Sequence, residues 1–221
     1  MNYKCIIFDC DGTLVDTLGG IASAMNRALA QYGFPPLPVE KYRDLIGWGI
    51  IRLAELAMPE SARQEEMVWN VAACAKELMV EQPADLSKPY PGIRELLLEL
   101  KALRPQKLKT AVISNKSDSV LQSLMDKLFG PFAFDAVYGQ RPGFAPKPDP
   151  TPVWEFLADI NCSPHNVIFA GDSEIDIETA RNAGCYPLGV SWGFRSRSVL
   201  EAAGAARIID TPEEIWELLN K

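Results

Sequence analysis

The feature that most constrains the fold is the alternation of short apolar runs with amphipathic, helix-like segments. The first apolar run covers residues 3–8 and ends in an aspartate-rich turn, and from residue 93 onward strand-like and helix-like segments follow one another. Such alternation is typical of a parallel sheet covered by helices on both faces. We therefore expect an α/β fold whose core is a doubly wound, Rossmann-like parallel sheet.

The hydrophobic periodicity assigns residue ranges to these elements. The expected strands cover residues 3–8, 108–113, 134–138, 167–170, 186–191 and 207–209. The expected helices in this part of the chain cover residues 93–103, 119–129, 153–159 and 175–182. Gly184 is expected to end the last of these helices, and a capping box at residues 211–214 is expected to open a final one.

Residues 17–86 break the alternation. Apolar residues there recur at helical spacing, proline-containing segments separate the helices, and no strand-like run is present. This all-helical stretch begins just after the first strand. We therefore expect a helical subdomain over residues 17–86, inserted into a core made of residues 1–16 and 87–221.

Charge and composition exclude several classes of protein. The formal net charge of −7 and the lack of a basic run argue against a nucleic-acid binder. No apolar run approaches the roughly 20 residues of a membrane span, and no signal peptide is visible. Five cysteines without Cys-x-x-Cys spacing predict reduced thiols in a cytoplasmic protein, expected to be a monomer or homodimer. The single histidine, His165, leaves little scope for histidine-based chemistry.

Three aspartates follow two of the expected strands. Asp9 and Asp11 come after the first strand, two residues apart, and Asp172 follows the strand over residues 167–170. The carboxyl ends of parallel strands form the ligand-binding edge of an open α/β sheet, so we expect these carboxylates to converge there. Oxygen ligands without histidine or thiolate favour Mg²⁺. With a bound cation, Asp9 could serve as a nucleophile and Asp11 as a proton shuttle.

Groups suited to a phosphate are expected at the same edge. Ser114 and Asn115 follow the strand over residues 108–113, and Lys147 lies between two prolines in the loop before the strand at 167. A hydroxyl, an amide and an ammonium group can surround phosphate oxygens. Taken singly, the Asp-x-Asp-Gly segment at residues 9–12 could be a calcium-loop fragment and the Ser-Asn pair a turn. The Gly-Asp-Ser segment at residues 171–173 could be a helix N-cap, and Lys147 a solvated lysine. Their order and their placement at strand ends favour a phosphoryl-transfer site.

Four segments in this order resemble the motifs of the haloacid dehalogenase superfamily, on its phosphatase side. They read FDCDGTLVDT at residues 8–17, VISNK at 112–116, KPDP at 147–150 and GDSEID at 171–176. The resemblance covers the whole chain. It implies that the helical insertion is a cap domain of the C1 type.

The resemblance also implies a role for each motif residue. Asp9 would attack phosphorus to form an aspartyl phosphate, while Asp11 would protonate the leaving oxygen and then activate water. Ser114 and Lys147 would bind the transferring phosphoryl group. The Mg²⁺ ligands would be the Asp9 carboxylate, the Asp11 backbone carbonyl and Asp172. Asp176 would support these ligands without binding the ion itself.

Within the superfamily the sequence is most similar to phosphoglycolate phosphatases, through residues 16–18, 47–50 and 88–92. The resemblance implies a small phosphorylated metabolite as substrate, with 2-phosphoglycolate as the best guess. A sugar phosphate, a nucleotide or pyrophosphate is the alternative for a phosphatase. Dehalogenases of the superfamily lack the second aspartate, so Asp11 argues against a dehalogenase. Phosphomutases of the superfamily tend to carry an arginine in the loop that here covers residues 47–50, and the nearest arginine, Arg52, lies outside this loop, which argues against a phosphomutase.

Other readings remain open from the sequence. Outside the enzymes, the acidic cluster could belong to a receiver-like domain or to a catalytically silent binding protein. In the cap, Arg43, Trp48 and Arg52 could reach the substrate, or they could simply be solvated or buried within the cap.

Overall fold

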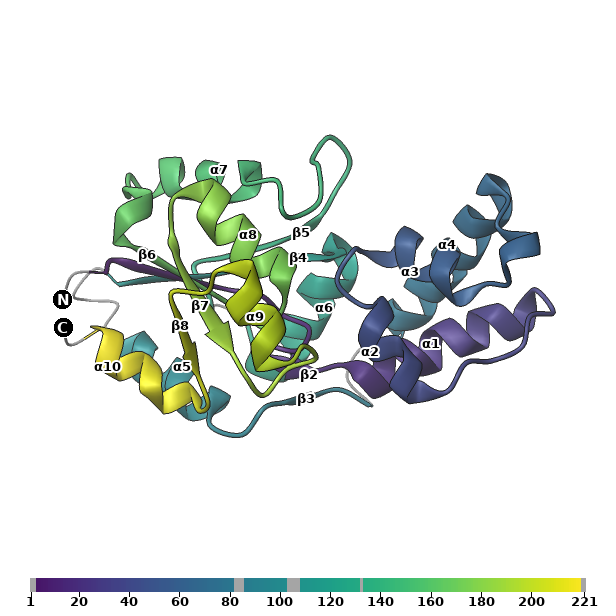
Figure 1. Cartoon of the computed structure of the whole chain (residues 1–221), viewed down its shortest axis with the longest axis horizontal. Coiled ribbons are helices and arrows are strands. Elements are labelled where there is room, and N and C mark those ends of the chain that lie inside the picture. Colours follow the sequence, from purple (N-terminus) through teal and green to yellow (C-terminus); the bar gives the residue numbers. More distant parts are fainter. Residues whose placement is uncertain (1–2, 82–85, 103–107, 132, 220–221) are drawn as a thin grey trace.

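The computed structural model describes residues 3–81, 86–102, 108–131 and 133–219 (Figure 1). These residues contain a six-stranded parallel sheet with the strand order β5-β4-β1-β6-β7-β8. The strands are β1 (Cys5–Phe8), β4 (Lys109–Ser117), β5 (Ala136–Gln140), β6 (Val167–Gly171), β7 (Tyr186–Val190) and β8 (Arg207–Ile209). This is the doubly wound, Rossmann-like order, so the expected α/β fold is confirmed.

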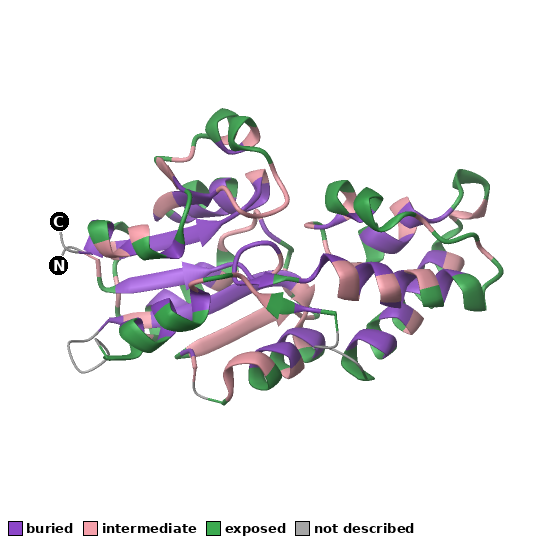
Figure 2. Cartoon of the chain, turned by 90° about the horizontal axis from the view of Figure 1, so that it is seen from below, coloured by how far each residue is buried: buried purple, intermediate pink, exposed green. Residues whose placement is uncertain are grey.

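Helices cover both faces of the sheet because successive side chains of a strand point to opposite faces. Ile6 and Phe8 of β1 pack toward one face, and Cys5 and Ile7 pack toward the other. The first face is covered by α5 (Ile93–Ala102), α6 (Asp118–Phe129) and α10 (Ile215–Leu219). The second is covered by α7 (Thr151–Asp159), α8 (Glu174–Ala183) and α9 (Arg197–Ala203). Figure 2 shows the central strands buried between these layers.

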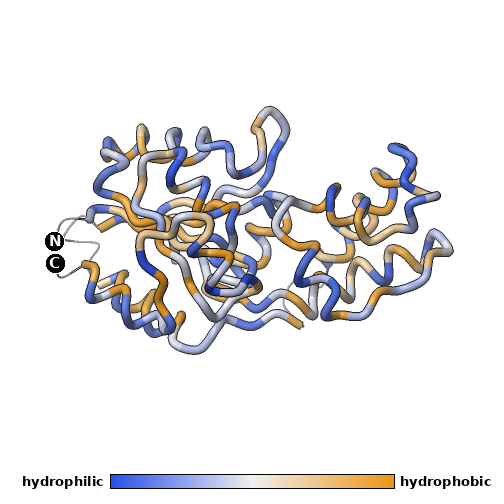
Figure 3. The backbone as a smooth tube through the Cα atoms, in the orientation of Figure 1, coloured by the Kyte–Doolittle hydropathy of each residue, from blue (hydrophilic) through white to orange (hydrophobic). Residues whose placement is uncertain are grey.

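The insertion forms a second body beside the sheet, at the right of Figure 1. Its helices are α1 (Leu18–Gln31), α2 (Tyr42–Leu45), α3 (Ile50–Ala57) and α4 (Glu65–Glu81). They enclose a hydrophobic cluster of their own, which Val120 of α6 joins from the sheet domain. Figure 3 shows hydrophobic residues, in orange, along the strands of the sheet and along the cap helices. The domain boundaries at 16/17 and 86/87 stay a prediction.

A two-stranded antiparallel ribbon connects the two bodies. It pairs β2 (Val15–Asp16) with β3 (Lys88–Pro89), where the chain enters and leaves the insertion. One of the proline-containing segments expected to separate helices, at residues 82–83, and the expected helix end at Leu103 lie outside the described residues. Short 3₁₀ turns cover η1 (Val39–Lys41), η2 (Glu60–Ala62), η4 (Pro164–Asn166) and η5 (Pro212–Glu214).

The structure lengthens one of the predicted strands and adds one helix and one two-stranded ribbon that were not predicted. Strand β4 continues to Ser117, because its polar end still pairs with β5 at Gln140. Helix α9 was not predicted, since of its seven residues only Leu200 is buried. The ribbon was also missed because each of its strands has two residues. The left-handed Gly184 at the end of α8 and the capping box at Thr211 are confirmed.

Among the described residues, no helix is both long and apolar enough to cross a membrane.

Candidate active site

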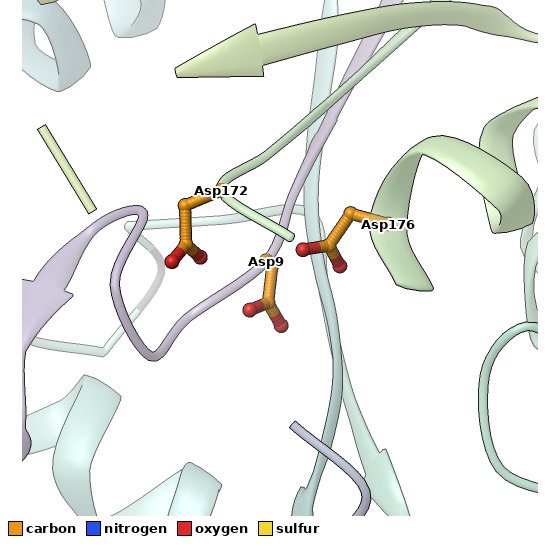
Figure 4. A group of neighbouring side chains, drawn as sticks. All are labelled: Asp9, Asp172 and Asp176. Carbon is orange, nitrogen blue, oxygen red and sulfur yellow. The ribbon is translucent and has the colours of Figure 1, made fainter. Parts of the chain in front are cut away.

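Three buried carboxylates meet where the two central strands of the sheet end. Asp9 follows β1, Asp172 follows the neighbouring β6, and Asp176 lies in the first turn of α8 (Figure 4). One carboxylate oxygen of each lies within 4.8 Å of the other two. This edge of the sheet is the topological switch point, because the chain builds outward from β1 in one direction and from β6 in the other.

Lys147 is the cation that contacts this group. Its Nζ donates to Asp9 Oδ1 at 2.7 Å, to Asp176 Oδ1 at 2.6 Å and to the Ile113 carbonyl oxygen at 3.1 Å. Three hydrogen bonds use all the protons of the ammonium group. The lysine side chain is therefore fixed, and it holds Asp9 in one orientation.

Asp172 is held by different donors. Its Oδ1 accepts from Thr13 Oγ1 at 3.1 Å, and its Oδ2 accepts from the Phe194 backbone N–H at 2.7 Å. Asp176 completes a capping box with Ser173 at the start of α8. The sequence reading of this segment as a helix N-cap is thus correct, and Asp176 contacts Lys147 as well.

Burial and the repulsion between neighbouring carboxylates raise the pKa values of Asp9 and Asp172. Burial, together with Asp176 and Asp11, raises the pKa of Asp9 to about 6, although Lys147 opposes this shift. The pKa of Asp172 is raised well above its usual range by burial and by the charges of Asp176 and Asp9. Burial alone would lower the pKa of Lys147, but the carboxylates of Asp176 and Asp9 raise it above its ordinary value.

The cluster fits a hard divalent cation. Of the three carboxylates in the described part of the chain, Lys147 pairs with Asp9 and Asp176 but not with Asp172, so negative charge is in excess at a buried position. Oxygen ligands at short mutual distances suit Mg²⁺, which would allow all of the carboxyl groups to ionise.

Gly12 allows the chain to turn tightly beside this cluster. Its φ of 86° is unfavourable for other residues, and an added Cβ would lie 2.3 Å from Asp172 Oδ2. The Asp-x-Asp-Gly sequence therefore has a structural requirement for its glycine.

Asp11 does not point into the carboxylate cluster, which corrects one expectation. Its oxygens accept from Thr17 Oγ1 at 2.7 Å and from Lys116 Nζ at 2.8 and 2.9 Å. Strand β1 ends at Phe8 and the chain already bends at Cys10, so the rule that residues two apart share a face does not apply to Asp9 and Asp11. Asp176, rather than the Asp11 carboxylate, is the third member of the cluster.

Lys116 was given no role from the sequence, although it directly follows Ser114 and Asn115. Its side chain is 7% exposed and pairs with both oxygens of Asp11. The charge of Asp11 raises the pKa of Lys116 against the opposing effect of burial. The extension of β4 beyond residue 113 is what brings this lysine to the site.

The side-chain amide of Asn115 is hydrogen-bonded to other groups of the protein. Its Nδ2 donates to the carbonyl oxygens of Gly47, at 2.9 Å, and Lys147, at 3.1 Å. Its Oδ1 accepts from the Lys147 backbone N–H at 2.7 Å. Asn115 therefore connects Gly47 of the cap to the loop that carries Lys147. Phosphate binding by its amide stays a prediction.

One pocket between the cap and the sheet domain gathers the predicted site residues. Its lining includes the six residues singled out from the sequence, namely Asp9, Asp11, Ser114, Asn115, Lys147 and Asp172. The cap contributes Gly47, Ile50 and Lys76, among others. Of the cap side chains considered beforehand, Arg52 pairs with Glu55 at the surface and Trp48 is 44% exposed.

Comparisons with known proteins agree with this site. Residues 6–190 match the sequence profile of haloacid dehalogenase-like hydrolases. The chain is 33% identical to a phosphoglycolate phosphatase of Caulobacter vibrioides, over 100% of this chain and 94% of the relative. It is 29% identical to the N-acetylmuramic acid 6-phosphate phosphatase of Pseudomonas aeruginosa, over 100% and 96% of the two chains.

A solved structure from Lactobacillus delbrueckii subsp. bulgaricus, provisionally named a phosphoglycolate phosphatase, is also similar. It superposes with a TM-score of 0.88 at 32% identity, covering 99% of each chain. The match includes the cap as well as the sheet domain, since nearly all of both chains is aligned. The chain therefore belongs to the haloacid dehalogenase-like hydrolase family.

Proposed function

We propose that this hydrolase is a Mg²⁺-dependent phosphatase that cleaves a small phosphomonoester through an aspartyl phosphate on Asp9. The observation that carries the proposal is the buried Asp9 carboxylate, held 2.7 Å from Lys147 Nζ beside Asp172 and Asp176. A carboxylate in such a fixed position is suited to attack on phosphorus. The phosphatases among its relatives support the same reaction class.

The reaction would take two steps. In the first, an Asp9 oxygen forms a bond to phosphorus, the ester P–O bond breaks, and Asp11 gives a proton to the leaving oxygen. In the second, Asp11 takes a proton from water, the water oxygen attacks phosphorus, and the bond to Asp9 breaks. Inorganic phosphate and the original carboxylate result, with Asp11 protonated again for the next cycle.

The remaining site residues would bind and neutralise charge. The Asp9 carboxylate, the Asp11 backbone carbonyl and Asp172 would hold Mg²⁺, which supplies positive charge to the phosphoryl oxygens. Ser114 and Lys147 would bind the transferring group. The pairing of Asp11 with Lys116 keeps this proton carrier at the pocket wall.

The proposed substrate is 2-phosphoglycolate. The phosphoglycolate phosphatases among the relatives support it, as does Lys76 in the lining of the pocket, since its positive charge suits a second anionic group. A sugar phosphate is the second candidate, because the N-acetylmuramic acid 6-phosphate relative matches the whole chain. We place the enzyme in the cytoplasm, and a monomeric or homodimeric state stays a prediction.

A substrate panel tests the proposal. Phosphate release is measured from 2-phosphoglycolate, sugar phosphates, nucleotides and pyrophosphate, with Mg²⁺ and with a chelator. We expect Mg²⁺-dependent release that Asp9→Asn lowers by at least about 10³-fold, since the nucleophile is lost.

The matched control is Asp126→Asn, which changes an exposed aspartate of α6 in the same way and should retain full activity. If folded protein released no phosphate from any ester, the proposal would be wrong. Release that survived in Asp9→Asn would refute the assignment of the nucleophile alone.

A further inference from the structure

Arg195 connects the sheet domain to the cap. It lies in the loop between β7 and α9, and its side chain is 13% exposed. Its Nη2 donates to the Ile46 carbonyl oxygen at 2.9 Å, and its Nη1 donates to the Arg43 carbonyl oxygen. Its Nε pairs with Glu174 Oε2 at 3.2 Å, within the sheet domain. One guanidinium group thus bridges both bodies of the molecule.

The two cap carbonyls belong to the C-terminal end of α2, which ends at Leu45. Carbonyl groups at this end of a helix lack partners within the helix and carry partial negative charge. A guanidinium group satisfies two acceptors at once, and a cation is favoured at this position. Arg195 therefore caps a helix of the cap domain from the sheet domain, while Glu174 holds the guanidinium in place.

The segment held in this way lies directly on the active site. Gly47 accepts a hydrogen bond from Asn115 Nδ2, and Gly49 approaches so closely that an added Cβ would lie 3.2 Å from the Asn115 carbonyl oxygen. Both glycines have positive φ values, 129° and 85°. The cap loop over residues 46–49 therefore forms a wall of the substrate pocket only while it is held against the sheet domain.

The other side of the Arg195 loop contacts the carboxylate cluster. The neighbouring Phe194 donates its backbone N–H to Asp172 Oδ2 at 2.7 Å. At Gly193 an added Cβ would lie 2.2 Å from the Asp172 Cβ, so the loop and the carboxylate are in contact. Consecutive residues of one loop thus contact the cap and an expected metal ligand.

We propose that Arg195 is a positioning residue that holds the cap closed over the active site. By capping α2 it keeps residues 46–49 on the pocket, and through Phe194 it couples cap closure to the orientation of Asp172. The kinetic consequence rests on the proposed phosphatase function, whereas the closure itself does not.

Arg195→Gln tests this inference, because it keeps a polar side chain but loses the positively charged guanidinium group. Backbone hydrogen exchange of the full chain is measured without substrate. We expect exchange at residues 46–49 to become at least about tenfold faster, as a charge-assisted contact is lost, while β1 and β6 remain protected. Arg197→Gln is the matched control, since Arg197 lies two residues away, pairs with Asp210 and is 44% exposed.

Kinetics provides a second readout. We expect Arg195→Gln to lower kcat for the best ester by at least about tenfold. Millimolar guanidinium should restore part of the rate to Arg195→Ala, which leaves space for the ion, and should not change the rate of Arg197→Ala.

Unchanged exchange at residues 46–49 in folded Arg195→Gln would overturn the inference, whatever the activity. If Arg195→Gln does not fold, Glu174→Gln replaces it, because it frees the guanidinium without removing it, and the same loop should again exchange faster. If the native chain hydrolyses no ester, the phosphatase proposal fails, yet the exchange experiment still decides whether Arg195 holds the cap.

Discussion

At the scale of single residues, the site depends on two buried lysines with different partners. Lys147 joins Asp9 and Asp176, and Lys116 joins Asp11. A buried ion pair contributes little net stability compared with apolar residues, but the loss of one partner leaves an uncompensated charge. The two pairs therefore fix the proposed nucleophile and the proposed proton carrier in separate positions.

Lys147→Met provides the prediction at this scale. It leaves Asp9 and Asp176 without their shared ammonium group, which should destabilise the protein by about 3–5 kcal/mol in the absence of metal. The loss of a preorganised charge should also lower kcat by at least about 10²–10³-fold. Urea unfolding and steady-state kinetics measure the two effects.

Lys101→Met, at an exposed position of α5, is the control and should change neither quantity by much. A folded Lys147→Met protein with native kcat would show that Lys147 has no part in the reaction.

At the scale of elements, the site is assembled by turns and strand ends. The turn after β1 places Gly12 against Asp172, and the extension of β4 carries Lys116 to the pocket. The first turn of α8 contributes Asp176, whose second task is to cap that helix. Each functional side chain is thus fixed by the backbone geometry of the element that carries it.

Gly12→Ala separates backbone cost from steric cost. Gly12 and Gly143 have φ values of 86° and 89°, so alanine should cost each roughly 1–2 kcal/mol from its conformation. At Gly143 an added Cβ meets nothing within 4 Å, whereas at Gly12 it meets Asp172. We expect Gly12→Ala to be clearly less stable than Gly143→Ala and to lose most activity.

Denaturant unfolding of both variants, with activity measured alongside, checks this prediction. Equal losses of stability at the two positions would contradict the close approach of Gly12 to Asp172.

At the scale of the whole molecule, the carboxylate cluster makes stability depend on pH and on metal. The folded-state pKa of Asp9, about 6, exceeds the value of about 3.9 for a free aspartate. Because the folded pKa is raised, the contribution of this group to stability is fully present below about pH 4 and is lost as pH rises through 6. Asp172 acts in the same direction.

Mg²⁺ should therefore stabilise the protein more at pH 7.5 than at pH 5, since it binds the ionised carboxylates. At a concentration of about 100 times Kd, the gain is about 2.7 kcal/mol, or roughly 5–10 °C in melting temperature for a chain of this size. Melting curves with Mg²⁺ and with chelator at both pH values measure the gain. Groups outside the cluster whose pKa values are lowered, such as Asp149 and Asp210, affect both curves equally and cancel in the difference.

Asp172→Asn is the control for the metal effect, because it removes one expected ligand with little change in shape. It should abolish most of the Mg²⁺-dependent gain. A gain that is equal at pH 5 and pH 7.5 would argue against metal binding by these carboxylates.

Much of the fold was accessible from the sequence because it depends on local patterns. Apolar runs of strand length, helical periodicity and glycine or proline punctuation depend on neighbouring residues, and they predicted the parallel sheet and the helical insertion. Segments with weak local signals, the two-residue strands of the ribbon and the mostly exposed α9, were missed.

By itself the sequence determined which residue types gather at the carboxyl edge of the sheet, since the strands along the chain place Asp9 and Asp172 directly after β1 and β6 and Ser114 in the last part of β4. Only the tertiary structure decided how their side chains are paired. It placed the Asp11 carboxylate outside the cluster, hydrogen-bonded the Asn115 amide to Gly47 of the cap, and brought Arg195 to the end of α2. These contacts join residues far apart in the chain, and their geometry depends on packing that no local pattern records.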